Sequence, residues 1–366
     1  MKMSATVLMA ALLSCATAAA ADMPVYRVAK DCAGVPQCYA TVAGALSAAG
    51  PEGWAVIKLG AGDFYEKVTI ARAKTILRGE GAGRSRLMFD AVAKTAGHYH
   101  RANWGTPGSA TLTIDADDIC IENLTVENTF DYLGNDALKD GDPKKNDAGQ
   151  AVAVLFDIHS DRVLVSDAAL LGYQDTLFAN GARAYIRRSL VAGNVDFIFG
   201  NGQVLIEDSE IRTRNRGSAV APGEFHSFVA APSTPLSQPI GIVAYHSRLT
   251  REAGVPDDSV ALARPWHPTT RFADGRYADP NAVGQVSFFD CSMDAHIHID
   301  HWASMPGTAR DGTKTAIFRP QDSRFSESGS TGPGARHNDI AISWKKPLTI
   351  ADIRARLFEN WTVPTP

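Results

Sequence analysis

The sequence predicts an all-β protein built as a parallel β-helix, in which short strands coil around one axis. The first observation is a repeated segment: residues 172–181 and 193–202 both follow the pattern G-x-x-D-x-[LI]-F-[AG]-N-G, at an offset of 21 residues. The second is a recurring motif in which an apolar anchor is followed by a small or apolar residue three positions later and an apolar residue five positions later. Its anchors are Ile121, Val165, Ile186, Ile206, Ala244 and Phe288.

The spacing of these anchors identifies the architecture. Successive anchors lie 44, 21, 20, 38 and 44 residues apart, close to one or two multiples of a single repeat. A fixed period of that size indicates a solenoid, in which each repeat packs mainly on its neighbours. The repeats are short β-rich runs separated by Gly, Asn and Asp, which favours strands over helices.

Elements near the two ends complete the predicted solenoid. The first strands are expected at 56–59, 68–70, 75–77 and 112–114, after a short helix at 40–49 that Gly50 would end. This helix would close the N-terminal end of the solenoid, because terminal repeats need a cap. Thr349 and Asp352 form a predicted capping box, which places a second helix at 349–360 on the solenoid surface.

Five long polar and aromatic segments separate the predicted strands. Loops this long in a compact fold are usually functional, so we expect them to project from one face and wall a cleft. The alternative is that about half of them only cover exposed sheet edges. The segments are 97–109, 130–149, 213–226, 250–282 and 294–335.

Composition excludes several classes of protein. The chain has 366 residues, a formal net charge of −4 and 45% hydrophobic residues, which is sufficient for a substantial core. No linker interrupts the repeats, so we expect one domain over 22–366, acting as a monomer. The mild acidity argues against a nucleic-acid partner, and no apolar run after the N-terminal segment is long enough to span a membrane.

Residues 1–21 are predicted to be a signal peptide. Lys2 supplies the positive end, residues 3–13 the apolar stretch, and three alanines at 19–21 a cleavage site. The alternative is cleavage before Cys15, which would be lipidated as in an outer-membrane lipoprotein. We favour ordinary secretion, and both readings take the mature protein out of the cytoplasm.

Four cysteines remain after the targeting segment, in an oxidising compartment. Cys32 and Cys38 are close enough in sequence to form a disulfide. Cys291 occupies the small inward position of the repeat, whereas Cys120 lies between two inward residues and should face the other way. We therefore expect these last two cysteines to remain unpaired.

The repeat places two carboxylates side by side. Asp175 and Asp196 each lie ten residues after an anchor, so they should stack on successive coils at the strand spacing of ~4.8 Å. Like charges at that distance repel by about 3 kcal/mol at an effective dielectric of ~20. Aspartates are common in structural turns, but unpaired stacked carboxylates destabilise a fold, so we interpret this pair as functional and as titrating together.

Three further side chains are candidates for the same site. Gln174 precedes Asp175, and Gln150 lies about one coil earlier; neutral amides can stabilise a developing oxyanion. Gln150 could instead simply begin a strand. Arg264, beside Pro265 and Trp266, could pair with one aspartate and keep it ionised, although an exposed surface arginine is the usual alternative.

Motifs for metals and cofactors are weak or absent. His296, His298 and His301 could be metal ligands by spacing, but no carboxylate or cysteine stands at a matching interval. No G-x-S-x-G elbow, phosphate loop or dinucleotide fingerprint is present. We expect neither a metal nor a cofactor.

Three ordered blocks resemble the diagnostic motifs of the pectin methylesterases, or pectinesterases, and the long loops resemble the bacterial enzymes from plant pathogens. The blocks lie at 172–177, 193–200 and 264–266. The resemblance implies a right-handed parallel β-helix that hydrolyses the methyl esters of pectin without a cofactor.

The resemblance also implies a role for each site residue. Asp196 would be the nucleophile, and Asp175 would protonate the leaving methanol and then activate water. Gln150 and Gln174 would hold the oxyanion, and Arg264 would orient Asp196. Trp266 would stack on a sugar ring, and neighbouring sugars would be contacted by Thr111, Phe199, Thr269 and Met305.

Alternative functions remain open at this point. A pectate lyase or polygalacturonase could share the fold, but a lyase would require calcium carboxylates and a basic residue. A lipidated cell-envelope homologue could act on another ester or thioester. A non-catalytic pectin-binding protein would not need two adjacent carboxylates.

Overall fold

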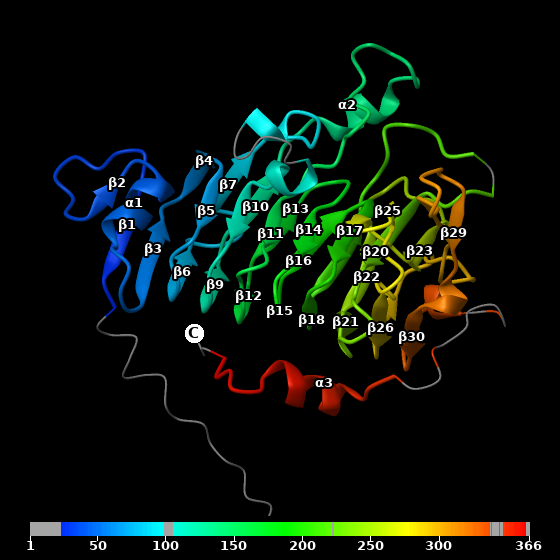
Figure 1. Ribbon diagram of the computed structural model, residues 1–366. Coiled ribbons are helices and arrows are strands. Elements are labelled where there is room, and N and C mark those ends of the chain that lie inside the picture. Colours follow the sequence, from blue (N-terminus) through cyan, green and yellow to red (C-terminus); the bar gives the residue numbers. More distant parts are fainter. Residues whose placement is uncertain are drawn as a thin grey trace, which may run out of the picture.

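The protein is a parallel β-helix with three sheets running along its length (Figure 1). The computed structural model describes residues 23–98, 105–221, 223–336, 338, 344 and 347–363. The predicted signal peptide at 1–21, with Cys15, lies outside the described residues. In the described part of the chain no helix has the length and apolar character needed to cross a membrane.

Sheet A is the longest of the three, and all of its strand pairs are parallel. Its order is β2 (Cys38–Tyr39), β1 (Val25–Val28), β3 (Ala55–Leu59), β6 (Thr75–Arg78), β9 (Ile119–Glu122), β12 (Val163–Ser166), β15 (Arg183–Arg187), β18 (Gln203–Glu207), β21 (Ile242–Tyr245), β26 (Gln285–Phe289) and β30 (Arg324–Ser328).

Sheets B and C form the other two sides of the coil. The order in sheet B is β27 (Ser292–Met293), β22 (Arg248–Arg251), β19 (Glu210–Thr213), β16 (Leu190–Gly193), β13 (Ala169–Leu171), β10 (Thr125–Asn128), β7 (Ser85–Phe89) and β4 (Gly62–Tyr65). The order in sheet C is β23 (Val260–Ala263), β20 (Ser227–Pro232), β17 (Val195–Gly200), β14 (Leu177–Ala179), β11 (Val154–Phe156), β8 (Leu112–Ile114) and β5 (Val68–Ile70).

The remaining elements are short. Two antiparallel hairpins pair β24 (Thr269–Phe272) with β25 (Gly275–Ala278) and β28 (Met305–Gly307) with β29 (Ala316–Phe318). The helices are α1 (Val42–Ala48), α2 (Tyr132–Ala137), α3 (Ile350–Leu357) and the 3₁₀ turns η1 (Ala96–His98), η2 (Thr106–Ser109), η3 (Pro320–Asp322) and η4 (Pro333–Ala335).

The predicted register of the coils is confirmed. Each anchor pairs directly with the next one across sheet A, in the order Ile121, Val165, Ile186, Ile206, Ala244 and Phe288. The residue two positions after each anchor has a φ between 45° and 56°, which turns the chain sharply from sheet A into sheet B. These residues are Asn123, Asp167, Arg188, Asp208, His246 and Asp290.

A ladder of buried serine hydroxyls follows this bend. The backbone N–H of Ala168 donates to Oγ of Ser189 at 3.2 Å, that of Ser189 to Oγ of Ser209 at 3.1 Å, and that of Ser209 to Oγ of Ser247 at 3.2 Å. The small residue of the repeat therefore satisfies a buried donor of the preceding coil, as buried polar groups require.

The two unpaired cysteines lie on opposite sides of sheet A, as predicted. Cys291 is in the central core, whereas Cys120 belongs to a second apolar cluster on the outer face of the sheet, and both are free thiols. The second cluster also contains Ile353 and Leu357 of α3, so the C-terminal helix lies on the solenoid as expected (Figure 1). The predicted capping box of Thr349 with Asp352 is present at its start.

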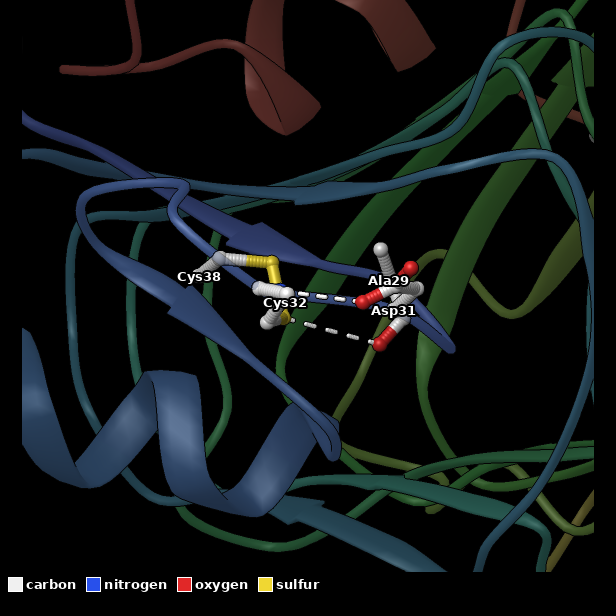
Figure 2. Close-up of a disulfide and its surroundings, with 5 residues drawn as sticks. Ala29, Asp31, Cys32 and Cys38 are labelled. Carbon is white, nitrogen blue, oxygen red and sulfur yellow. Dashed lines mark hydrogen bonds between the residues drawn. A yellow bond between two sulfur atoms is a disulfide. The ribbon is translucent and has the colours of Figure 1, made fainter.

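The N-terminal coil carries the predicted Cys32–Cys38 disulfide (Figure 2). Helix α1 is shorter than the predicted 40–49, because it begins after the Thr41 cap, and it buries Val42 and Ala45 against the first coils. Glu66 accepts hydrogen bonds from the first two N–H groups of α1 at 2.8 and 2.9 Å.

Long connections between sheets B and C lie on one side of the solenoid. They include 129–153, which carries α2, and the described parts of the next connection, 214–221 and 223–226; Figure 1 shows α2 rising above the sheets. The expectation that 250–282 and 294–335 are loops throughout is wrong. They contain β23, β30 and both hairpins, which were missed because their runs of three to five residues are too short to show a periodic pattern.

Candidate active site

Asp175 and Asp196 occupy the predicted equivalent places at the start of the sheet C strands of successive coils. The backbone N–H of Asp175 donates to the carbonyl of Val195 at 3.0 Å, and Leu177 pairs directly with Ile198. Both aspartates have left-handed backbones, with φ of 66° and 52°. That conformation is unfavourable by roughly 1–2 kcal/mol for a residue with a side chain, and such strain is concentrated at functional sites.

Arg264 makes the two carboxylates electrostatically different. Its Nε donates to Oδ1 of Asp196 at 2.7 Å and its Nη2 to Oδ2 at 2.6 Å. The guanidinium also lies 3.9 Å from the ring centre of Phe228. Burial lowers the pKa of Arg264, but the charge of Asp196 and its hydrogen bonds more than reverse this, so Arg264 stays a cation.

Asp175 is the member of the pair whose pKa is raised. Burial raises the pKa of Asp175 well above its usual range, and the negative charge of Asp196 raises it further, while Arg264 opposes both effects only in part. The two residues are 8% and 7% exposed. An acid therefore stands beside an ion-paired carboxylate, a division of roles that suits general acid catalysis next to a nucleophile.

The two aspartates open into a cavity of about 460 Å³. Gln150 and Gln174 line it, and the N–H of Ala151 donates to the carbonyl of Gln174 at 3.2 Å, which keeps the two glutamines on adjacent coils close together. The sequence-predicted core of the site is therefore assembled in one place. The full lining is Thr106, Pro107, Gln150, Gln174, Asp175, Phe178, Asp196, Phe199, Ala231, Arg264, Trp266 and Met305.

Aromatic rings form one wall of this cavity. Phe178 and Phe199 stack with ring centres 4.2 Å apart, and Trp266 lies 5.6 Å from Phe199 at 60°. Met305, at the start of β28, lies at the edge of the same cavity. This wall offers apolar area to the faces of sugar rings.

Two residues that were predicted to contact sugars do not line this cavity. Thr111 is fully buried and its hydroxyl donates to the carbonyl of Glu127 at 3.0 Å, so this side chain does not line the cavity, and its sugar contact stays a prediction. Thr269 is not part of the cavity wall, and its hydroxyl shares a hydrogen bond of 2.9 Å with Thr308. Short polar residues next to a site carry no sequence signal for the direction in which they point.

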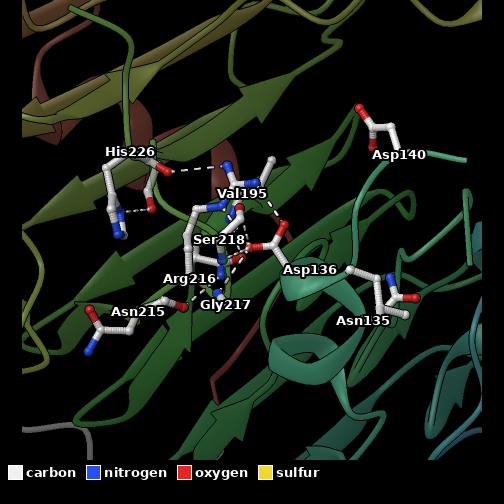
Figure 3. Close-up of polar contacts among 12 residues, drawn as sticks. Asn135, Asp136, Asp140, Val195, Asn215, Arg216, Gly217, Ser218 and His226 are labelled. Carbon is white, nitrogen blue, oxygen red and sulfur yellow. Dashed lines mark hydrogen bonds and ion pairs between the residues drawn. The ribbon is translucent and has the colours of Figure 1, made fainter. Parts of the chain in front are cut away.

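A second cavity of about 720 Å³ adjoins the first, and Gln150, Gln174 and Arg264 line both. One wall is a contact between the two long B–C connections, in which Asp136 of α2 accepts from Arg216 Nη2 at 2.9 Å and from the N–H and Oγ of Ser218 at 3.0 and 2.9 Å (Figure 3). These partners are about 80 residues apart, and nothing in the repeat could have indicated them.

The three histidines do not converge. His296 is fully buried, with burial lowering its pKa to about 4. The ring of His298 packs on Phe225, and His301 Nε2 lies 3.3 Å from the carbonyl of Gly334. Across the described ranges, no group of three or more histidines, cysteines and carboxylates is placed to hold a metal ion.

Comparison with known proteins shows the family of this chain. The sequence model of the Pectinesterase family matches residues 26–274. Pectinesterase A of Dickeya chrysanthemi is 39% identical, covering 90% of this chain and 89% of that protein, and pectinesterase A of Dickeya dadantii (strain 3937) is 38% identical with the same coverage.

Solved structures show the same relationship. The pectin methylesterase PemA from Erwinia chrysanthemi superposes with a TM-score of 0.84 at 37% identity, covering 94% of this chain and 98% of that one. The pectin methylesterase from Yersinia enterocolitica superposes with a TM-score of 0.79 at 37% identity, covering 88% and 99%. The chain therefore belongs to the pectinesterase family.

Proposed function

We propose that this protein is a carboxylic ester hydrolase that removes methyl esters from pectin, with Asp196 as nucleophile and Asp175 as acid and base. The observation that carries the proposal is the pair of hydrogen bonds from Arg264 to Asp196, beside a buried Asp175 whose pKa is raised. Membership of the pectinesterase family supports the reaction and the substrate class.

The first half-reaction forms an acyl-enzyme. An oxygen of Asp196 attacks the ester carbonyl carbon, and the amides of Gln150 and Gln174 donate hydrogen bonds to the oxyanion that develops. The bond to the methoxy oxygen breaks as Asp175 gives that oxygen its proton, so methanol leaves. An anhydride then joins Asp196 to the galacturonate.

The second half-reaction releases the acid. Asp175, now a carboxylate, takes a proton from water, whose oxygen attacks the acyl carbonyl of the galacturonate. The bond to the Asp196 oxygen breaks, and the guanidinium of Arg264 receives the regenerated carboxylate in its two hydrogen bonds. The product is galacturonic acid, which gives its proton to solvent and becomes the carboxylate, and both aspartates return to their starting protonation states.

The aromatic wall supports binding of a polymer rather than of a small ester. Phe199 and Trp266 present adjacent apolar surfaces beside the reacting pair, and Met305 borders the same cavity. We assign these three side chains to sugar contacts. The Trp266→Ala variant should raise KM for pectin by at least ~10-fold, because burial of apolar surface contributes about 25 cal/mol per Å² and a tenfold change in affinity requires only about 1.4 kcal/mol.

Methanol release from highly methylated pectin tests the proposal. The Asp196→Ala and Asp175→Ala variants are compared with wild type in the presence of a calcium chelator. The matched control is Asp208→Ala, which removes an aspartate with the same left-handed backbone (φ 48°) from a bend outside the cleft. We expect at least a ~10³-fold loss of kcat for Asp196→Ala and no change for Asp208→Ala.

Other outcomes discriminate among the alternatives. Folded wild-type protein that binds pectin but releases no methanol would be a binding protein. Release of unsaturated products that stops on addition of the chelator would indicate a lyase. Both results would overturn the esterase assignment.

We further propose that the chain is exported and acts as a monomer, with residues 1–21 removed. Mass spectrometry of the mature N-terminus tests this, because cleavage after Ala21 and a lipidated Cys15 give different masses. Light scattering of the purified enzyme gives the oligomeric state.

A further inference from the structure

Arg214, one residue after β19, touches both of the turns that carry the aspartates. Its backbone N–H donates to the carbonyl of Gly193 at 2.7 Å, and its Nη1 donates to the carbonyl of Gly172 at 3.0 Å. Gly172 and Gly193 lie three residues before Asp175 and Asp196 respectively. One residue of the next coil therefore fixes the entry to both turns.

The guanidinium of Arg214 also packs on the residue between Gly172 and Gln174. Its central carbon lies 3.9 Å from the ring centre of Tyr173. Tyr173 in turn stacks on Tyr132 of α2, with ring centres 5.2 Å apart and planes within 8°. Tyr132 is buried, so the stack is anchored in the base of the 129–153 connection.

Glu252 of the following coil holds Arg214 in this orientation. Its Oε1 accepts from Arg214 Nε at 3.0 Å, and its Oε2 accepts from the N–H of Asn215 at 3.1 Å. The side chains of Arg214 and Glu252 are 19% and 34% exposed. Four successive coils are thereby joined at the bend from which the catalytic side chains project.

These contacts hold the backbone of the two turns that carry Asp175 and Asp196. Asp175 and Asp196 both have left-handed backbones, which persist only where the surrounding structure over-determines them. The two turns are also closely packed on each other, because a Cβ added at Gly193 would lie 2.5 Å from the carbonyl oxygen of Tyr173. A small relaxation of either turn would displace a carboxylate.

We propose that Arg214, oriented by Glu252, is a positioning residue that holds the Asp175 and Asp196 turns in their reactive geometry. This inference rests on the proposed esterase function. Arg214 does not line the cavity that contains the two aspartates, so it acts through Gly172, Tyr173 and Gly193 rather than on the substrate.

The test compares Arg214→Met with Arg212→Met. Arg212 lies two residues earlier and is also ion-paired, with its Nη2 2.7 Å from a carboxylate oxygen of Glu210. Glu210 belongs to the same strand, so this contact does not reach the turns that carry the aspartates. We expect Arg214→Met to lower kcat for methanol release by about 10–100-fold, with KM within about threefold, because misplacement of catalytic groups affects the transition state. Arg212→Met should match wild type.

Two additional variants separate positioning from charge. Arg214→Lys keeps the positive charge but has no planar fork to stack on Tyr173 while bonding two acceptors, so it should restore only a small part of kcat. Glu252→Gln keeps the shape of the side chain that bonds Arg214 but removes its charge. It should lower kcat by less than Arg214→Met does. Rates are compared at a temperature where circular dichroism shows every variant folded.

A titration provides a readout that does not depend on activity. Carbon-detected NMR of the Asp175 carboxyl should show a lower pKa in Arg214→Met than in wild type, because a relaxed turn exposes this group to water. Equal kcat and equal Asp175 titration in the two arginine variants would overturn the inference. Wild type that releases no methanol would instead refute the esterase function, and the titration would still decide the role of Arg214.

Discussion

Arg264 places both of its carboxylate hydrogen bonds on Asp196, at 2.7 and 2.6 Å, although Asp175 lies on the adjacent coil. The same contact explains why the two aspartates differ. Asp196 accepts two hydrogen bonds from a cationic guanidinium. The pKa of Asp175 is instead raised by burial and by the negative charge of Asp196. Two identical side chains at equivalent positions of a repeat thus have different electrostatic surroundings.

Replacing Arg264 by lysine should lower kcat by about 10²-fold, because an ammonium keeps the charge but cannot reproduce the planar two-point contact that orients Asp196. The measurement is initial methanol release at saturating pectin. Arg188→Lys is the matched control, since Arg188 forks onto Asp167 at 2.9 and 2.6 Å on the bend between sheets A and B. Equal losses in both variants would contradict a specific role for Arg264.

Replacing Asp175 by asparagine should stabilise the protein relative to wild type, and this difference should grow as pH rises. The folded-state pKa of Asp175 is raised, so its contribution to stability is fully present below the unfolded-state pKa of about 3.9 and is lost as pH rises through the folded value. The Tm of Asp175→Asn minus that of wild type should be near zero at pH 3.

Above neutral pH this difference should reach about 2 °C or more, since 1 kcal/mol shifts Tm by about 2–4 °C in domains of 150–250 residues. Differential scanning calorimetry across pH measures it, with Asp208→Asn as the control that removes an exposed carboxylate. A Tm difference that does not grow with pH would show that Asp175 is not destabilising when ionised.

Replacing Ser209 by alanine should destabilise the fold by about 1–3 kcal/mol, because the buried N–H of Ser189 loses its acceptor. Urea unfolding gives the free energy, and kcat should be unchanged in the folded enzyme. Ser292→Ala, at an exposed position of β27, is the control and should be neutral. If both substitutions are neutral, the ladder does not contribute to stability.

Removing the disulfide with Cys32→Ser and Cys38→Ser should lower stability by about 2 kcal/mol, the value that loop-closure entropy gives for a ring this short. The bond lies beside β1 and β2 at one end of sheet A, so activity should not change. A reductant should lower the Tm of wild type but not that of the double variant. A loss of kcat would show that the first coils influence the cleft.

The repeat in the sequence was sufficient to predict which residues stack. Val165 and Ile186 pair in register, and Asp175 and Asp196 therefore meet, because the coil length sets both relationships. The outward direction of Cys120 followed from strand alternation. Each of these inferences uses only distance along the chain.

Contacts between loops of unequal length could not be predicted in this way. Asp136 reaches Arg216 across 80 residues, and Arg214 bonds a glycine 42 residues earlier. Thr111 was expected at the substrate, yet its hydroxyl turns inward to Glu127, because the direction of a side chain next to a bend depends on local backbone angles. Contacts of this kind can be identified only from the three-dimensional structure.

Helix α3 and the residues after it add long-range contacts to a fold in which most contacts join neighbouring coils. Strands in the three sheets pair only with the neighbouring coils, which by itself would let a solenoid unfold gradually from either end. Leu357 and Trp361 share one apolar cluster with Val56 of β3 and Phe289 of β26, so a single segment spans most of the length of sheet A. Opening either end therefore also disturbs this shared cluster, which couples the first coils to the last ones.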